Sequence, residues 1–159
     1  MNKAIFLDRD GVVNKEIGYV TCADELELLP DSIEAMKVFQ QKGYLLIIIT
    51  NQGGITKGLY SEMDLKKIHD KMNNELETHG IKITETYYCV HHDKYTKCLC
   101  RKPDSIMIEK GIARFDIDVS TSYMVGDFDR DIEAGEKAGL KSIKIESNSS
   151  LLNILHLID

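Results

Sequence analysis

The chain has 159 residues, of which 43% are hydrophobic, and this suits one domain with a well-buried core rather than two domains. Its formal net charge of −6 argues against a nucleic-acid-binding surface, which usually needs clustered lysine and arginine side chains. The first residues contain no apolar run long enough for a secretion signal or a membrane span. We therefore expect a cytoplasmic protein, a monomer, that binds neither nucleic acid nor membrane.

Strand and helix patterns alternate along the chain. Short apolar runs rich in β-branched or aromatic residues predict five strands, at residues 4–7, 45–49, 87–90, 123–125 and 142–145. Between them, apolar residues at helical spacing predict helices that start at Asp31, at Ser61 with a capping box to Asp64, at Pro103 and near Arg130. This alternation predicts an α/β fold with a doubly wound, Rossmann-like parallel sheet.

The most informative segment is Asp8-Arg9-Asp10-Gly11, directly after the first predicted strand. Its two carboxylates can share one face only if the chain bends after the strand, which Gly11 permits. Placed together, they could hold a divalent cation, with one carboxylate as a covalent nucleophile and the other as a proton donor. Taken alone, the segment fits a solvated turn better, because Asp and Gly are common turn residues. The remaining motifs reverse that preference.

Further polar segments follow the other predicted strands: residues 50–54, then Arg101 and Lys102, then Asp127. Because ligands bind beyond the carboxyl ends of the strands in such sheets, we expect these segments to meet Asp8. A hydroxyl and amide groups in residues 50–54 suit phosphate oxygens, and the two cations suit an anionic substrate. Two or three carboxylates together would suit magnesium. Each segment alone also fits a polar surface loop.

Asp131 lies one helical turn beyond Asp127, where it either orients the metal ligands or caps the helix, and both roles fit equally well. Asp129 is expected on the surface. Residues 14–30 are too many for a simple turn, so we expect them to fold over the site.

Three cysteines and one histidine are spaced as a metal site. Cys89 and His91 form one pair, and Cys98 and Cys100 form another, which together give the ligands of a closed tetrahedral zinc site. Such a zinc ion is structural: it pins a loop that has no core of its own, and so positions Arg101. The alternative is a set of buried or free thiols.

Other cysteines and histidines are expected to play no part in chemistry. They are His92 as loop surface, Cys22 as a small apolar filler, and His69, His79 and His156 as structural or solvated side chains.

These motifs resemble the haloacid dehalogenase (HAD) superfamily of phosphohydrolases, whose pattern is an aspartate pair after the first strand, a Thr or Ser after the second, a Lys and a late acidic motif. The stretches FLDRDGVVN, TNQGGITKG, YYCVHH, CLCRKP and SYMVGD are similar to the small capless branch that contains heptose bisphosphate and histidinol-phosphate phosphatases. The resemblance covers nearly the whole chain. It implies a single capless HAD-like domain over residues 1–159, with a zinc loop at about 89–100.

The resemblance implies that Asp8 is the nucleophile and Asp10 the proton donor, in a magnesium-dependent hydrolysis through an aspartyl phosphate. Thr50 and Lys102 would stabilise the transferring phosphoryl group, and Arg101 would recognise the substrate. Metal ligands are implied as Asp8, the backbone carbonyl of Asp10 and Asp127 for magnesium, and Cys89, His91, Cys98 and Cys100 for zinc. Further substrate contacts are implied for Arg9, Glu16, Gly18, Tyr19, Asn51, Gln52 and Gly53.

Two substrates compete under this resemblance. The loop of six residues between His91 and Cys98 is short, as expected of histidinol-phosphate enzymes, and Phe128 replaces a cation that heptose enzymes usually carry. The stretches GYV, GITKG and YYCVHH favour a heptose bisphosphate, used in lipopolysaccharide or surface-layer sugar synthesis. We favour the heptose, with histidinol phosphate or another small sugar phosphate as the alternative. A zinc-stabilised interaction module and a nucleic-acid 3′-phosphatase are disfavoured by the intact acidic set and the negative charge.

Overall fold

A computed structural model describes all 159 residues and has a five-stranded sheet at its centre. The strands are β1 (Lys3–Leu7), β2 (Tyr44–Asn51), β3 (Ile83–Cys89), β4 (Tyr123–Gly126) and β5 (Lys141–Lys144), in the spatial order β3-β2-β1-β4-β5. All neighbouring pairs are parallel. The chain winds outward from β1 through β2 and β3, and then from β1's other side through β4 and β5. The predicted doubly wound sheet is confirmed, and its switch point lies between β1 and β4.

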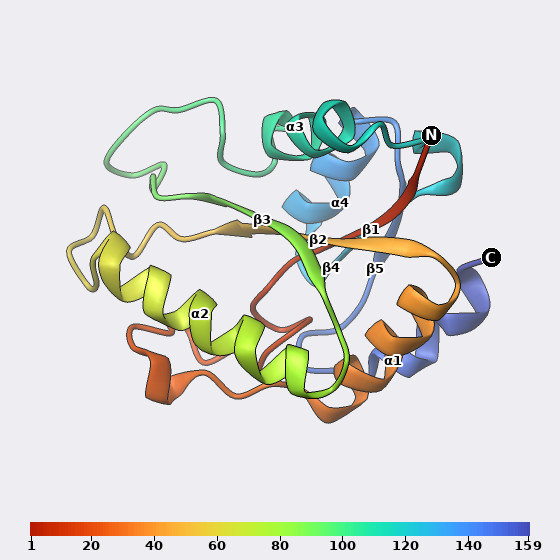
Figure 1. Ribbon diagram of the computed structural model, residues 1–159. Coiled ribbons are helices and arrows are strands. Elements are labelled where there is room, and N and C mark those ends of the chain that lie inside the picture. Colours follow the sequence, from red (N-terminus) through yellow and green to blue (C-terminus); the bar gives the residue numbers. More distant parts are fainter.

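Helices cover both faces of this sheet (Figure 1). Helices α1 (Pro30–Gln41) and α2 (Glu62–Thr78) lie on one face, and α3 (Ile106–Phe115) and α4 (Asp129–Lys137) lie on the other. Short 3-10 helices η1 (Ala23–Glu25), η2 (Val119–Thr121) and η3 (Leu151–Leu157) complete the elements, with η3 against α1. The longest helix, α2, has 17 residues, and no helix combines the length and apolar character needed to cross a bilayer.

Side-chain alternation along β1 builds the core on both faces. Ile5 and Leu7 pack with α1 and α2, whereas Ala4 and Phe6 pack with α3 and α4. All four side chains are fully buried, which explains why the strand reads as one continuous apolar run.

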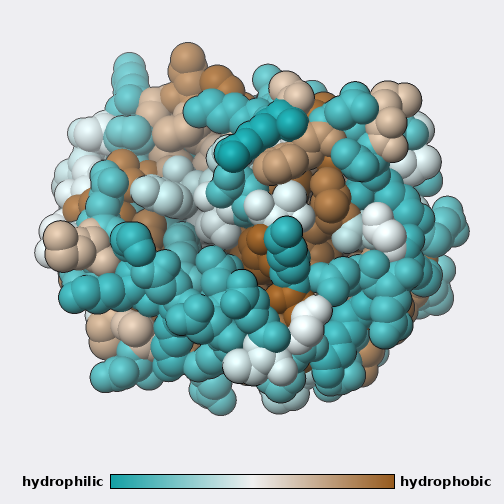
Figure 2. All heavy atoms as spheres, in the orientation of Figure 1, coloured by the Kyte–Doolittle hydropathy of each residue, from teal (hydrophilic) through white to brown (hydrophobic).

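On the outside, the face drawn in Figure 2 is mostly hydrophilic, with hydrophobic residues in patches between polar ones. The rigid sheet fixes where its strand ends present polar side chains.

Two predicted helix starts are wrong. Helix α1 is not capped by Asp31: it begins at Pro30 after the N-cap Leu29, because the fixed backbone angle of proline suits a first helical position. Helix α3 begins at Ile106, since Pro103 lies in a turn closed by the Asp104 N–H donating to the Arg101 carbonyl at 2.9 Å.

The capping box of α2 is confirmed, with the Asp64 N–H donating to the Ser61 hydroxyl at 3.1 Å and the Ser61 N–H donating to the Asp64 carboxylate at 2.9 Å. Strand β3 begins earlier than predicted, because an edge strand tolerates polar residues such as Glu85. Cys22 is exposed, so its expected role as an apolar filler is wrong.

Candidate active site

The early and late carboxylates meet at the switch point of the sheet. The backbone N–H of Asp8 donates to the carbonyl of Val125 at 3.0 Å, which joins the ends of β1 and β4. Carboxylate oxygens of Asp8, Asp127 and Asp131 all lie within 4.8 Å of one another, and all three residues are buried. The geometry therefore brings together the acidic residues that the sequence placed at separate strand ends.

Lys102 is the buried cation of this group, with an exposure of 1%. Its ammonium nitrogen Nζ lies 2.8 Å from Oδ1 of Asp8 and 2.7 Å from Oδ1 of Asp131, and it donates to the carbonyl of Ile49 at 2.7 Å. Burial alone would lower the pKa of Lys102, but these two carboxylates raise it above its usual value. Lys102 is therefore a charged ammonium group held against Asp8.

Asp131 fills the capping role, whereas its role in orienting the metal ligands stays a prediction. Its Oδ2 accepts a hydrogen bond from the backbone N–H of Phe128 at 3.0 Å, which caps α4, while Oδ1 contacts Lys102. A Cβ on Gly126 would collide with the Asp131 side chain, so the close approach needs a glycine there. Asp129 is on the surface as predicted, with a side-chain exposure of 92%.

Asp10 is surrounded by hydrogen-bond donors. Nη2 of Arg9 lies 2.9 Å from Oδ1 and 3.1 Å from Oδ2 of Asp10, and Nδ2 of Asn14 donates to Oδ1 at 2.9 Å. Nε2 of Gln52 donates to Oδ2 at 3.2 Å. Arg9 is fully buried and does not line the cavity. Its guanidinium fixes Asp10, and the implied contact between Arg9 and the substrate stays a prediction.

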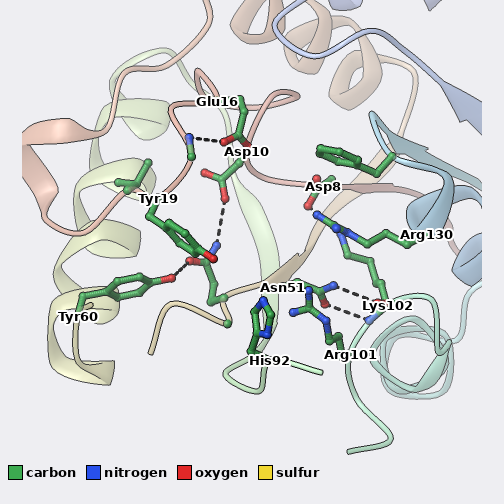
Figure 3. A pocket seen from close by; sticks show the side chains of 15 residues that line it. Asp8, Asp10, Glu16, Tyr19, Asn51, Tyr60, His92, Arg101, Lys102 and Arg130 are labelled. Atoms are coloured by element: carbon green, nitrogen blue, oxygen red, sulfur yellow. Dashed lines mark hydrogen bonds and ion pairs between the residues drawn. The ribbon is translucent and has the colours of Figure 1, made fainter. Parts of the chain in front are cut away.

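A cavity of about 260 Å³ opens over these carboxylates (Figure 3). Its size suits a small phosphorylated metabolite. Of the implied substrate contacts, the cavity is lined by Asp8, Asp10, Glu16, Gly18, Tyr19, Asn51, Gln52, Gly53, Arg101 and Lys102. It is also lined by five residues that sequence reasoning missed as site residues, Val20, Tyr60, His92, Phe128 and Arg130. The expectation that His92 is only loop surface is therefore wrong.

Tyr60 orients the polar groups beside Asp10. Burial raises the pKa of Tyr60 to about 12, so its hydroxyl keeps its proton and donates to Oε1 of Gln52. That hydrogen bond turns Nε2 of Gln52 toward Asp10 and toward the Thr50 hydroxyl, which accepts at 2.8 Å. Thr50 itself is buried behind the cavity lining. No motif marked Tyr60, because its role depends on the turn that precedes α2.

The segment 14–30 folds over the site, as its length suggested. The backbone N–H of Glu16 donates to Asn148 at 2.7 Å, and the carboxylate of Glu16 accepts from Gly18 N–H at 2.5 Å. Burial raises the pKa of Glu16. At the far end, the Lys57 ammonium donates to the Tyr19 hydroxyl at 2.6 Å. These contacts close one side of the cavity.

The acidic residues fit a divalent cation. Oδ2 of Asp127 accepts from the Ser147 hydroxyl at 2.6 Å, but its Oδ1 is buried and has no hydrogen-bond partner. A buried carboxylate oxygen without a partner is costly, and a hard cation shared with Asp8 would satisfy it. The carbonyl of Asp10 as a third ligand stays a prediction.

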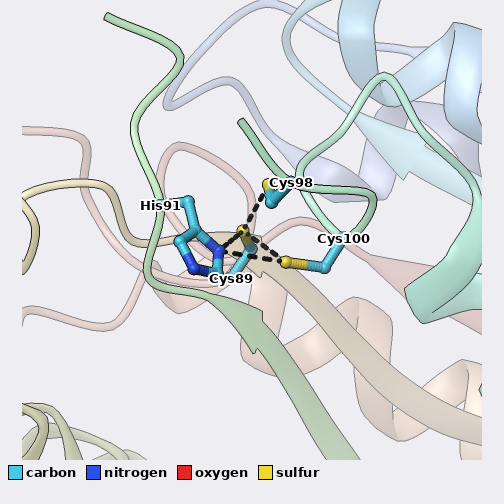
Figure 4. A group of neighbouring side chains, drawn as sticks. All are labelled: Cys89, His91, Cys98 and Cys100. Carbon is cyan, nitrogen blue, oxygen red and sulfur yellow. Dashed lines mark hydrogen bonds between the residues drawn. The ribbon is translucent and has the colours of Figure 1, made fainter. Parts of the chain in front are cut away.

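The predicted zinc ligands also converge (Figure 4). Sγ of Cys89 lies 3.4 Å from Nδ1 of His91 and 3.7 Å from Sγ of Cys98, and Nδ1 of His91 lies 3.4 Å from Sγ of Cys100. The four ligand atoms all lie within 4.8 Å of one another, and none of the thiols is in a disulfide. This donor set fits zinc. Arg101 follows directly and donates to the carbonyl of His91 at 3.1 Å, which ties it to the loop.

Known proteins share this arrangement. A family model described as HAD-hydrolase-like matches residues 99–152. The D-glycero-alpha-D-manno-heptose-1,7-bisphosphate 7-phosphatase of Photorhabdus laumondii is 40% identical over 87% of this chain and 79% of its own. The D-glycero-beta-D-manno-heptose-1,7-bisphosphate 7-phosphatase of Pasteurella multocida is 41% identical over 89% of this chain and 80% of its own. The crystal structure of D,D-heptose 1,7-bisphosphate phosphatase from B. bronchiseptica, complexed with magnesium and phosphate, has a TM-score of 0.84 and 30% identity, covering 98% of each chain.

Fold, site and similarity together define a phosphatase among the HAD-like hydrolases, which confirms the resemblance found in the sequence. Within that class, the chain belongs to the family of the D-glycero-D-manno-heptose-1,7-bisphosphate 7-phosphatases.

Proposed function

We propose that this phosphatase uses Asp8 as a covalent nucleophile and that its substrate is a heptose 1,7-bisphosphate, cleaved at carbon 7. The observation that carries the proposal is the meeting of Asp8, Lys102 and Asp127, of which Asp8 and Lys102 line a small cavity. The names of the similar relatives support the choice of sugar. Residues 1–159 would act as one capless catalytic domain, with the zinc loop at about 89–100 beside its cavity.

In the first step, a carboxylate oxygen of Asp8 attacks phosphorus while the bond from phosphorus to the sugar oxygen breaks. Asp10 gives a proton to that leaving oxygen, so the products are an aspartyl phosphate and a free hydroxyl group. Lys102 neutralises charge that gathers on the phosphoryl oxygens, since its ammonium already lies beside Asp8. A bound magnesium ion, held by Asp8, Asp127 and the Asp10 carbonyl, would add positive charge at the same place.

In the second step, water attacks phosphorus and passes a proton to Asp10. The bond between phosphorus and Asp8 breaks, which releases inorganic phosphate and restores both carboxyl groups to their starting states. Gln52 and Arg9 keep Asp10 in one position through both steps, because each donates a hydrogen bond to its carboxylate. Thr50 would support the phosphoryl-binding end of the cavity from behind, because its hydroxyl accepts a hydrogen bond from Gln52.

Zinc is proposed as a structural ion on Cys89, His91, Cys98 and Cys100. Four protein ligands leave no open position for substrate, so its role is to hold the loop and thereby Arg101.

The negative net charge supports the further proposal that neither nucleic acid nor an anionic membrane is a partner.

The test is magnesium-supported phosphate release from the heptose bisphosphate and from histidinol phosphate, which is kept as the alternative because of the short loop after His91. We expect the heptose to be turned over far faster, and equal turnover would contradict the sugar assignment. Asp8→Asn should abolish turnover without unfolding the protein. Asp129→Asn is the matched control, because that carboxylate points into solvent. Turnover by Asp8→Asn would contradict the covalent route.

A further inference from the structure

Two arginines at the rim of the site have no acidic partner. Arg130 takes part in no side-chain hydrogen bond or ion pair, and its Nε is buried without a partner. Arg101 forms no ion pair either, and donates only to the backbone carbonyl of His91. Both residues line the cavity and also a second hollow of about 490 Å³ beside the zinc loop. Unpaired guanidinium groups that face a cavity are free to bind an anion.

The second hollow is positively charged, although the protein as a whole is acidic. Three cationic side chains without an ion pair line it against two carboxylates: Lys97, Arg101 and Arg130 against Asp93 and Asp104. Lys102 also lines it, but its ammonium is paired with Asp8 and Asp131. The first cavity instead contains the nucleophile and the other reacting carboxylates. An anionic group of the substrate that lies outside the reacting centre would therefore be drawn toward this second hollow.

Phe128 holds the Arg130 guanidinium in place. The guanidinium carbon of Arg130 lies 4.4 Å from the centroid of the Phe128 ring, and this stacking leaves the N–H edges of the fork free. The side chain reaches from the first turn of α4 into the cavity (Figure 3). The first turn of α4 thus carries a cation to the rim of the cavity, held against an aromatic ring.

We propose that Arg130, together with Arg101, binds a second phosphate of the substrate, remote from the one that is cleaved. This inference rests on the proposed function and deepens it, because it assigns a residue of α4 to the phosphate that is not cleaved. Lys102 serves the reacting phosphoryl group, whereas Arg130 binds the distal one. A substrate with a cationic end, such as histidinol phosphate, meets repulsion at the same place.

The experiment compares two substrates, the heptose 1,7-bisphosphate and the same sugar with a phosphate only at carbon 7. In Arg130→Gln, we expect kcat/KM for the bisphosphate to fall by about ten- to a hundredfold, mainly through KM, because one charge-assisted contact is lost. The monophosphate should be hydrolysed as by the native protein. Arg130→Lys keeps the charge without the fork, and should lose less than Arg130→Gln.

The matched control is Arg114→Gln, which removes an exposed arginine paired with Glu85 on the outer surface and should affect neither substrate. Equal losses on both substrates in Arg130→Gln, or no loss on either, would overturn the assignment of Arg130. A native protein that releases phosphate from neither substrate would instead contradict the proposed function, so the two failures are distinguishable.

Discussion

Nε2 of the buried His69 lies 3.2 Å from Nη1 of Arg9, and the other side of the same guanidinium holds the Asp10 carboxylate. Burial first, and then the charge of Arg9, lowers the pKa of His69 to about 4. The imidazole is therefore neutral at pH 7, and its Nε2 accepts the hydrogen bond from Arg9. A continuous set of polar contacts thus runs from α2 to Asp10, the proposed proton donor.

This contact predicts a pH-dependent loss of stability. His69 takes up a proton near pH 6.5 when unfolded but only near pH 4 when folded, so its contribution to stability is complete above about pH 6.5 and falls as the pH drops toward 4. The expected loss is about 2–3 kcal/mol in the free energy of unfolding. His69→Gln keeps an acceptor and does not titrate. Urea unfolding at pH 7 and pH 4.5 should show a smaller acid loss in the variant, and parallel losses would refute the assignment.

Lys102→Met should disable the site and destabilise the fold together. It leaves the carboxylates of Asp8 and Asp131 buried without their cation, which costs about 3–5 kcal/mol when one partner of a buried pair is removed. Turnover should fall by about a hundred- to a thousandfold or more. Lys66→Met is the control, because Lys66 forms an exposed pair with Asp70. A Lys102→Met protein with near-native kcat would show that the phosphoryl group is stabilised by something else.

Gly11→Ala should damage catalysis more than stability. Gly11 has φ +81°, and a Cβ there would collide with Oδ2 of Asp127 and with the Ser147 hydroxyl. Gly58→Ala is a close control, because Gly58 has φ +75° and no atom within 4 Å of such a Cβ. Both variants should lose about 1–2 kcal/mol of unfolding free energy through backbone strain. Only Gly11→Ala should lose turnover, and equal kcat values in the two variants would contradict the role of Asp127.

Loss of zinc should weaken substrate binding more than it weakens the central sheet. We expect about one zinc ion per chain by metal analysis, and Cys100→Ser should lower that content, lower the melting temperature and raise KM through displacement of Arg101. Cys22→Ser replaces an exposed thiol far along the sequence from the four ligands and should change none of these quantities. A native protein with little zinc, or identical behaviour of the two variants, would argue for free thiols.

Much of the fold could be predicted because its central strands are buried on both faces. Such strands read as unbroken apolar runs, as in Ala4 to Leu7, and the polar residue that follows each one is then placed at the sheet edge by topology alone. The edge strand β3 was only partly predicted, because residues such as Glu85 face solvent and break the apolar pattern.

The rest of the site depends on side-chain geometry that spacing does not encode. Arg9 stands between Asp8 and Asp10 in the sequence, yet its side chain turns into the protein to meet His69. Arg130 looked like the start of a helix, and its access to the cavity depends on stacking against Phe128. Neither orientation follows from residue type or periodicity.

Three consecutive residues lie in the proposed zinc site, in the cavity lining and against the proposed nucleophile in turn: Cys100, Arg101 and Lys102. No residue separates these three positions, so an insertion there would shift the zinc loop relative to Asp8. Between His91 and Cys98 no such restraint applies, and that stretch can change in length while its two anchored ends stay fixed. A change in the length of that stretch would therefore leave the contact between Lys102 and Asp8 in place.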